Sequence, residues 1–283
     1  MTLVVVHGPA GAQGRPVLDE LRRRGSRVRA VSRRPVPGVP HAPSDLLDVE
    51  ALARAYDGAD GVMIVLPGGA PDDVAVRQAE TVLAALARAE VPRAVFNPGG
   101  AVWARPTGLP FLDARTVIAS GLAQAVPHAA LVGPAVGYLE NLAEGHVGRR
   151  VVAAGELALP APGDVPEVRV AAADVATVAV ETLLADAPPR ALTMVTGPEV
   201  LTGEQAAGAL GRHLGRPVRY VQVDVEEHLR GVADALGAQY AANITRLYGP
   251  GAHIPDPGPP PAGTALVTGP TTLADWLPTR HWH

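Results

Sequence analysis

Three glycines near the amino end are the first residues whose spacing could support chemistry. Gly8, Gly11 and Gly14 follow the β-branched run 3–6 and lead into the helical apolar pattern of residues 16–24. In such a strand–turn–helix, the first glycine permits a tight turn, the second lets backbone approach a pyrophosphate, and the third lets helix pack on strand. The positive end of the helix then favours the phosphates. The spacing predicts a dinucleotide site; the alternative is a tight turn that binds nothing.

Arginines at the end of the next expected strand bear on the identity of the dinucleotide. The strand expected over residues 27–32 ends in Ser32 and is followed by Arg33 and Arg34. A carboxylate at this position would bond the 2′-hydroxyl of NAD, whereas arginine suits the 2′-phosphate of NADP. No carboxylate stands there, so the sequence predicts NADPH as the cofactor. Two solvated arginines at a strand end are the alternative.

Turns that follow other strands should complete the same site, because the carboxyl ends of parallel strands meet at one edge of a sheet. Strands are expected over residues 61–66 and 91–96, each followed by a glycine-containing turn. The residues predicted on these grounds to contact the cofactor are Gly8, Ala10, Gly11, Ala12, Gln13, Gly14, Ser32, Arg33, Arg34, Leu66, Pro67, Gly68, Asn97, Pro98 and Gly99.

Strand and helix patterns alternate along the chain. Beyond the strands already named, the patterns predict helices over 49–56, 74–88 and 115–125, a strand over 128–132, and a proline-broken loop over 35–43. This alternation predicts an α/β fold with a doubly wound parallel Rossmann sheet. Residues 1–132 are expected to form the NADP-binding Rossmann domain. Residues 133–283 are expected to form a small C-terminal substrate lobe, partly interleaved with the sheet.

Composition excludes several classes of function. The 283 residues are 47% hydrophobic, which suffices for a large core, and the net charge of −4 without a long basic block argues against nucleic-acid binding. The chain has no cysteine, and its histidines show no metal-ligand spacing, so no metal site is expected. No apolar run approaches the ~20 residues of a membrane span, and no signal pattern is seen. We expect a cytoplasmic monomer or homodimer that binds a small-molecule substrate and no membrane.

Short motifs follow the glycine turn in a fixed order. They are Asp45-Leu46-Leu47-Asp48, the segment 132–141 ending in Glu140-Asn141, the segment 172–179 containing Asp174, and the segments 196–202 and 215–220. With this order the chain resembles the NmrA-like members of the atypical short-chain dehydrogenases/reductases, a group of quinone reductase-like enzymes and NADP-sensing regulators. The resemblance implies that Asp45 and Leu46 border the adenine and that Asp174 is a helix N-cap. His7 stands where the family usually has threonine, and Gly133 replaces an arginine.

Catalytic residues are harder to assign, because all 24 basic residues are arginine and the chain contains no lysine. Typical short-chain dehydrogenases use a Tyr-x-x-x-Lys pair in which lysine helps tyrosine to donate a proton, and that pair is absent from this sequence. Arg115 lies roughly where related reductases place a catalytic lysine. The candidate catalytic residues are therefore Tyr138, His128 and Arg115, and the candidate substrate-binding residues are Trp103, Tyr138 and Asn141; a structural role is the alternative for each.

The resemblance implies an enzyme that reduces a quinone-like or conjugated carbonyl molecule with NADPH, since such acceptors need little help from a protein acid. Two other functions remain open on the same fold. One is a redox-neutral cyclase or isomerase of a biosynthetic pathway, and the other is a non-enzymatic NADP(H)-sensing regulator. A reductase would oxidise NADPH when given an acceptor, and neither alternative would do so.

Overall fold

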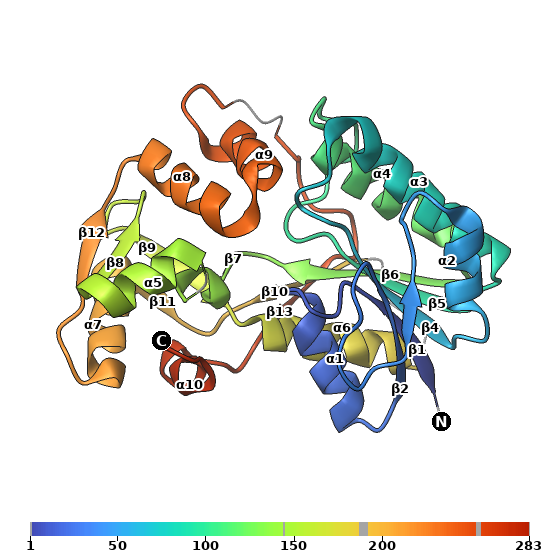
Figure 1. The fold of residues 1–283 in the computed structure, drawn as a ribbon, viewed down its shortest axis with the longest axis horizontal. Coiled ribbons are helices and arrows are strands. Elements are labelled where there is room, and N and C mark those ends of the chain that lie inside the picture. Colours follow the sequence, from blue (N-terminus) through green and yellow to red (C-terminus); the bar gives the residue numbers. More distant parts are fainter. Residues whose placement is uncertain (1, 144, 187–191, 253–255, 283) are drawn as a thin grey trace. The chain divides into compact units, whose positions relative to one another are not determined.

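The chain folds into two compact units in the computed structural model, which describes residues 2–143, 145–186, 192–252 and 256–282. The first unit comprises residues 1–135, 172–195 and 255–267, and the second comprises 136–171, 196–254 and 268–283. The chain therefore crosses between the units several times, as the colours of Figure 1 show. The assignment of cofactor to one unit and substrate to the other stays a prediction.

An eight-stranded sheet is the centre of the first unit in the described part of the chain, and its order is β13-β10-β6-β5-β4-β1-β2-β3. Every pairing from β10 to β3 is parallel. The strands are β1 (Leu3–His7), β2 (Arg27–Ser32), β3 (His41–Pro43), β4 (Gly61–Val65), β5 (Arg93–Asn97), β6 (His128–Pro134), β10 (Leu192–Thr196) and β13 (Ala265–Thr268). The strand order reverses between β1 and β4, and ligands of open α/β sheets bind at such a switch point.

Helices cover the sheet on both faces (Figure 1). They are α1 (Gly14–Arg23) and α6 (Ala172–Leu184) on one face, and α2 (Val49–Tyr56), α3 (Asp72–Arg88) and α4 (Pro110–Ala125) on the other. The main core lies beneath α2, α3 and α4, where Leu52 and Leu86 pack against Val5, Ile64 and Phe96 of the sheet. These observations confirm the predicted α/β fold with a doubly wound parallel sheet.

Three local expectations differ from the structure. Helix α4 begins at Pro110 and not at Arg115, since proline is well suited to the first helical turn. Residues 41–43 form β3 within the expected loop, because an edge strand tolerates proline. Asp174 lies inside the first turn of α6, which already begins at Ala172, so its expected role as N-cap is wrong. Its carboxylate still lies at the positive end of the helix.

The second unit combines two small sheets with helices. One sheet has the order β11-β9-β7 and the other pairs β12 with β8. Its elements are β7 (Gly137–Tyr138), η1 (Leu139–Leu142), α5 (Gly145–Ala154), β8 (Glu156–Leu159), β9 (Pro166–Val170), β11 (Val200–Thr202), α7 (Gly203–Leu214), β12 (Arg219–Gln222), α8 (Val225–Leu236), α9 (Ala238–Tyr248), α10 (Leu273–Trp276) and η2 (Leu277–Thr279). Among the described residues, none of the helices has the length and apolar character needed to span a membrane.

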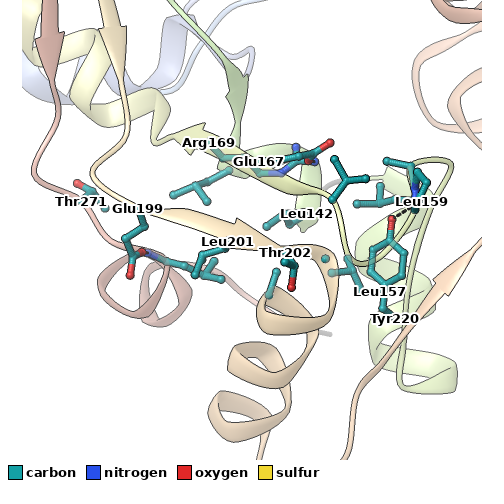
Figure 2. Close-up of a pocket in the computed structure, with 17 residues that line it drawn as sticks. Leu142, Leu157, Leu159, Glu167, Arg169, Glu199, Leu201, Thr202, Tyr220 and Thr271 are labelled. Atoms are coloured by element: carbon teal, nitrogen blue, oxygen red, sulfur yellow. Dashed lines mark hydrogen bonds and ion pairs between the residues drawn. The ribbon is translucent and has the colours of Figure 1, made fainter.

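A small cavity lies in the second unit, and Figure 2 shows residues that line it. Leucines such as Leu157 and Leu201 line it, together with the ion-paired Arg169 and Glu167. Tyr220 also lines it and is held by a hydrogen bond from its hydroxyl to the Ala161 carbonyl oxygen, 2.6 Å long. The cavity volume is about 30 Å³, which is room for about two water molecules and not for a drug-sized ligand.

Candidate cofactor site

The glycine turn lies at the carboxyl end of β1, next to the switch point of the sheet. Gly8 has a φ of +55°, a conformation that favours glycine, and its N–H donates to the carbonyl oxygen of Val31 at 3.0 Å. The Gly11 N–H donates to the Gly8 carbonyl oxygen at 2.9 Å. These bonds fix the turn to β2 on one side and lead the chain directly into α1 at Gly14.

Gly14 and Gly11 are glycines for different reasons. A Cβ at Gly14 would stand 2.2 Å from the carbonyl oxygen of Gly8, so the fold itself excludes a side chain there. A Cβ at Gly11 would meet only that same oxygen at 3.4 Å, an ordinary van der Waals contact. Packing within the protein therefore does not require glycine at position 11. A ligand that approaches the exposed backbone there would require it, because any side chain would stand in the way.

The amino end of α1 is open to an anion. Its N-cap residue, Gln13, makes no side-chain capping hydrogen bond, and the first turn contains no acidic residue. The first N–H groups of a helix lack partners within the helix and carry its positive dipole end. The surrounding Gly8, Ala10, Gly11 and Ala12 are exposed. This arrangement suits a phosphate or pyrophosphate.

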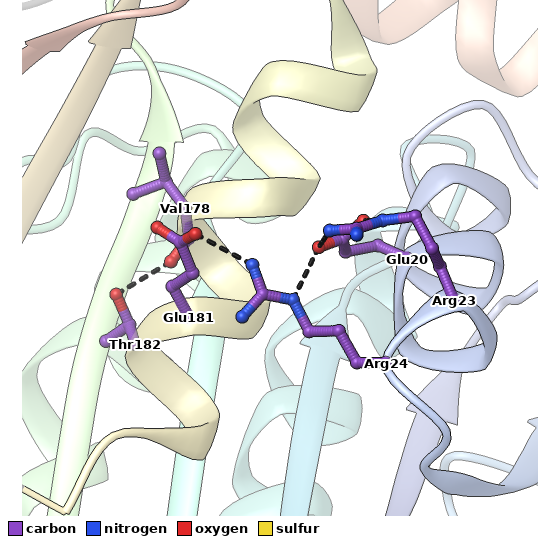
Figure 3. Close-up of polar contacts among 6 residues, drawn as sticks. All are labelled: Glu20, Arg23, Arg24, Val178, Glu181 and Thr182. Atoms are coloured by element: carbon purple, nitrogen blue, oxygen red, sulfur yellow. Dashed lines mark hydrogen bonds and ion pairs between the residues drawn. The ribbon is translucent and has the colours of Figure 1, made fainter.

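Helix α1 is anchored to α6 on the face of the sheet that these two helices cover (Figure 3). Arg24, which follows α1, donates from Nε to Glu20 at 2.6 Å and from Nη2 to Glu181 of α6 at 2.7 Å. Arg23 also bonds to Glu20, and the two guanidinium groups hold the pKa of the Glu20 carboxyl below its ordinary value, with the hydrogen bond from Arg23 as the largest cause. The network fixes the helix whose amino end faces the turn.

The end of β2 carries the arginines predicted to read the 2′-phosphate. The Ser32 hydroxyl donates to the Arg34 carbonyl oxygen at 2.6 Å, and the Ser32 carbonyl oxygen accepts from His41 Nε2 at 2.8 Å. Arg33 and Arg34 are both exposed. Within the described ranges, neither guanidinium has a hydrogen bond or an ion pair. Both side chains therefore keep all their donors for a ligand.

The segment after β3 is held by its own carboxylates. Asp45 Oδ1 accepts from the Leu47 N–H at 3.0 Å, and Asp48 Oδ1 accepts from the Ala51 N–H at 2.9 Å as the N-cap of α2. Leu46 is half-buried against the main core. The expected contact of Asp45 and Leu46 with an adenine stays a prediction.

The turns after β4 and β5 lie at the same edge of the sheet. Leu66 is buried, Pro67 is exposed and Gly68 is half-buried after β4. After β5, Asn97 is buried and its Oδ1 accepts from the Gly99 N–H at 2.8 Å. The side chain of Gln13 reaches this second turn, because a Cβ at Gly99 would lie 3.3 Å from Gln13 Nε2. Parallel pairing of β2, β1, β4 and β5 thus brings the predicted turns to one edge.

Arg115 holds the β5 turn against α4. Its Nε donates to the Pro98 carbonyl oxygen at 2.9 Å, and its Nη1 donates to the carbonyl oxygen of Phe111. The guanidinium also lies 5.9 Å from the centre of the Phe111 ring. These contacts account for the arginine structurally, and its catalytic role stays a prediction.

His128 is not near these turns. It is the first residue of β6 and pairs with Arg93, the first residue of β5, so it lies at the amino edge of the sheet. The glycine turn is at the carboxyl edge of the sheet. A five-residue strand such as β5 separates these two edges by roughly 13 Å. The candidate catalytic role of His128 does not fit this position, because a residue that opens a parallel strand faces the edge opposite to the glycine turn.

The other predicted substrate residues are divided between the two units. Trp103 is half-buried in the segment after β5 of the first unit. Tyr138 is half-buried in β7 and Asn141 is exposed in η1, both in the second unit. Their contacts with a substrate stay predictions. No group of three histidine, cysteine, aspartate or glutamate residues in the described ranges is arranged to hold a metal ion.

A buried polar pair directly behind the turn was not anticipated from the sequence. His7 Nε2 and the Tyr56 hydroxyl are 2.7 Å apart, and the two rings stack with centroids 5.7 Å apart. Burial lowers the pKa of His7 to about 4 and raises that of Tyr56, so both are neutral near pH 7. The available signal was a single polar residue at the end of a buried β-branched run.

Comparisons with known proteins agree with this architecture. A relative named (4-alkanoyl-5-oxo-2,5-dihydrofuran-3-yl)methyl phosphate reductase, from Streptomyces griseus subsp. griseus, is 31% identical over 259 residues, which cover 87% of this chain and 84% of the relative. A relative named NAD(P)H azoreductase, from Xenophilus azovorans, is 29% identical over 262 residues, which cover 84% and 86%.

The same fold occurs in a solved structure of the Escherichia coli NADPH-dependent quinone oxidoreductase QOR2 in complex with NADPH. The TM-score is 0.66 at 18% identity, and the match covers 98% of this chain and 99% of that chain. The sequence profile of the NmrA-like family matches residues 1–277. This match covers both compact units, including the glycine turn, and the chain belongs to the NmrA-like family.

Proposed function

We propose that the protein is an NAD(P)H-dependent oxidoreductase that prefers NADPH and reduces a quinone-like or conjugated carbonyl compound. One observation carries the proposal: the glycine turn leaves the backbone of Gly11 open at the switch point of the sheet, beside an uncapped helix end. The two curated relatives are both named reductases, which supports the reaction class.

Different residues at the carboxyl edge of the sheet would bind different parts of the cofactor. The amino end of α1 and the backbone at Gly11 would hold the pyrophosphate, and Arg33 with Arg34 would hold a 2′-phosphate. When bound, the cofactor supplies a hydride, and the protein supplies position and a site with little water. Arginine pairs well with phosphate because its planar fork makes two parallel charge-assisted bonds.

The substrate class follows from the acid groups that the chain lacks. Without lysine, no Tyr-x-x-x-Lys pair can lower the pKa of a proton-donating tyrosine. The reduced oxygens of a quinone take protons readily from water, so reduction needs no strong protein acid. Tyr138 is the residue we propose as a weakly tuned donor for acceptors that do need one.

The first test separates a ligand-binding glycine from a structural one. Gly11→Val places methyl groups where phosphate should contact backbone and would hold the phosphate away from the amino end of α1. We expect NADPH affinity to fall by at least about tenfold, an effect of the size of one charge-assisted hydrogen bond. The thermal unfolding midpoint should change little, because a Cβ at position 11 meets only the Gly8 carbonyl oxygen, at 3.4 Å. Gly208→Ala is the matched control, since a Cβ there meets only the flexible end of Arg212 at 3.6 Å. Full NADPH affinity in Gly11→Val would refute the proposed site.

The second test concerns the preference for NADPH. Replacing both Arg33 and Arg34 by alanine should weaken NADPH binding roughly 10- to 100-fold and leave NADH binding nearly unchanged. Arg27→Ala is the control, because Arg27 is an exposed arginine at the opposite end of the same strand. Isothermal titration calorimetry measures each affinity. Equal affinities of the wild-type protein for NADPH and NADH would contradict the preference.

Turnover decides between the reductase and the two other functions. We expect the purified protein to oxidise NADPH in the presence of a quinone panel, followed by absorbance at the nicotinamide band in stopped flow. If NADPH binds but no acceptor oxidises it above the uncatalysed rate, the reductase proposal fails. A regulator that senses NADP(H), or a redox-neutral enzyme, would then be the better description.

A further inference from the structure

We propose that a hollow between β3 and α2 is a second anion site, which takes a small oxyanion such as a phosphate group and is separate from the cofactor turn. The hollow has a volume of about 280 Å³ and opens at the β3 edge of the large sheet. Its polar lining comes from Arg29 of β2, His41 of β3, Ser44 and Arg54 of α2. The proposal adds a site to the first unit that the proposed reaction does not use.

Arg29 is held in place for this role. Its Nη1 donates to the carbonyl oxygens of Ala55 and Asp57, each at 2.8 Å, at the carboxyl end of α2. These two bonds hold the guanidinium group, and in the described part of the chain its Nη2 and Nε have no partner. A fixed guanidinium with unused donors loses less entropy when it binds an anion than a freely rotating side chain.

Arg54 of α2 supplies a second cation to the lining of the hollow. It is exposed, and its guanidinium makes no hydrogen bond or ion pair with the residues that the structure describes. His41 is fixed by donating from Nε2 to the Ser32 carbonyl oxygen, and Ser44 adds a hydroxyl. The two positively charged guanidinium groups that line the hollow repel each other, and an anion bound in the hollow would offset this repulsion.

No carboxylate lines the hollow within the described ranges. The acidic residues on the first turn of α2 already have other partners. Asp48 caps the helix through the Ala51 N–H at 2.9 Å, and Glu50 pairs with Arg88 at 3.0 Å. The positive charge of the hollow is therefore not neutralised by these acidic neighbours, and an oxyanion from solution is the group that fits it.

The hollow and the glycine turn lie at different positions along β2. The turn is bonded to Val31 at the carboxyl end of the strand, whereas Arg29 stands lower and the neighbouring Ala30 pairs with His41. A phosphate group could come from either of two sources: from the bound cofactor, or from a separate phosphorylated molecule. We infer the second source, because the predicted 2′-phosphate readers, Arg33 and Arg34, lie beyond the end of the strand.

The test uses inorganic phosphate as the probe and ³¹P NMR or calorimetry as the readout. We expect saturable phosphate binding to the wild-type protein, weakened about tenfold or more in Arg54→Gln, since one charge-assisted bond is lost. Arg27→Gln should bind as the wild type does, because it removes an exposed arginine of β2 outside the hollow. Arg54 makes no bond within the described structure, so its replacement should leave the unfolding midpoint unchanged.

Repeating the titration with saturating NADPH separates the two sources. Unchanged phosphate affinity supports a separate site, and displacement of phosphate by NADPH would overturn it. Absence of saturable binding to the wild type, or equal losses in Arg54→Gln and Arg27→Gln, would also overturn the proposal. The phosphate titration without cofactor tests this site even if the protein binds no NADPH. Failure of the proposed function and failure of this site are therefore distinguishable.

Discussion

Acid should destabilise the protein through His7, and His7→Gln should remove this part of the pH dependence. Burial lowers the pKa of His7 to about 4 in the folded protein, whereas a histidine in an unfolded chain titrates near about 6.5. Above pH 6.5 neither state binds the proton. Between 6.5 and 4 the unfolded chain binds it and the folded protein does not, so stability falls as the pH falls. Below pH 4 both states are protonated and the loss is complete.

The difference between these two pKa values corresponds to a loss of about 3 kcal/mol of stability. A domain is typically stable by about 5 to 15 kcal/mol, so this is a large share. Glutamine at position 7 can keep a hydrogen bond to the Tyr56 hydroxyl, which lies 2.7 Å from His7 Nε2. Glutamine does not titrate, so the variant removes the effect of protonation at position 7 and keeps the hydrogen bond.

Urea unfolding followed by circular dichroism at pH values from 7.5 to 4.5 measures the effect. We expect the slope of the unfolding free energy against pH to be smaller in His7→Gln than in the wild type by up to about 1.4 kcal/mol per pH unit. His213→Gln is the control, because it removes an exposed histidine of α7. Arginine partners also lower the pKa values of carboxyl groups such as those of Glu20 and Glu156. Protonation of these groups in acid destabilises the folded protein equally in every variant. Identical slopes for the wild type and His7→Gln would refute the reasoning.

Three other changes test the second unit. Tyr138→Phe should change quinone reduction by less than about threefold but slow enone reduction by ~10²-fold or more, as read by stopped-flow NADPH oxidation, because only the enolate needs a donor. Glu140→Ala should cost about 3 to 5 kcal/mol in urea unfolding, since the buried carboxylate accepts from Arg280 at 2.8 Å. His146 and His228 are 3.1 Å apart and burial lowers the pKa of each. The hydrogen-exchange protection factors of α8, corrected for the intrinsic pH dependence of amide exchange, should therefore fall from pH 7.5 to pH 5 in the wild type and not in His228→Gln. A matching fall in that variant would exclude the histidine pair as the cause.

The sequence alone determined the features that depend on neighbouring residues. The bounds of β2 (Arg27–Ser32) and α2 (Val49–Tyr56) agree with the patterns, because side-chain periodicity reports local backbone geometry. The position of the glycine turn followed in the same way, since Gly8, Gly11 and Gly14 lie close together in the chain at a regular spacing. The family followed from the order of short motifs, and the sequence profile confirms it.

Pairings between distant segments required the tertiary structure. The return of α6, β10 and β13 to the first unit depends on which strand edges pair, and periodicity does not encode that choice.

His128 shows the same limit at a single residue. Its position at the amino edge became clear only from the register with β5, because a strand pattern does not say which end faces the site. His7 and Tyr56 are 49 residues apart, and the burial that shifts the pKa of each arises only when β1 and α2 pack together. The free energy of such contacts comes from excluded water and close packing, which are properties of the assembled fold.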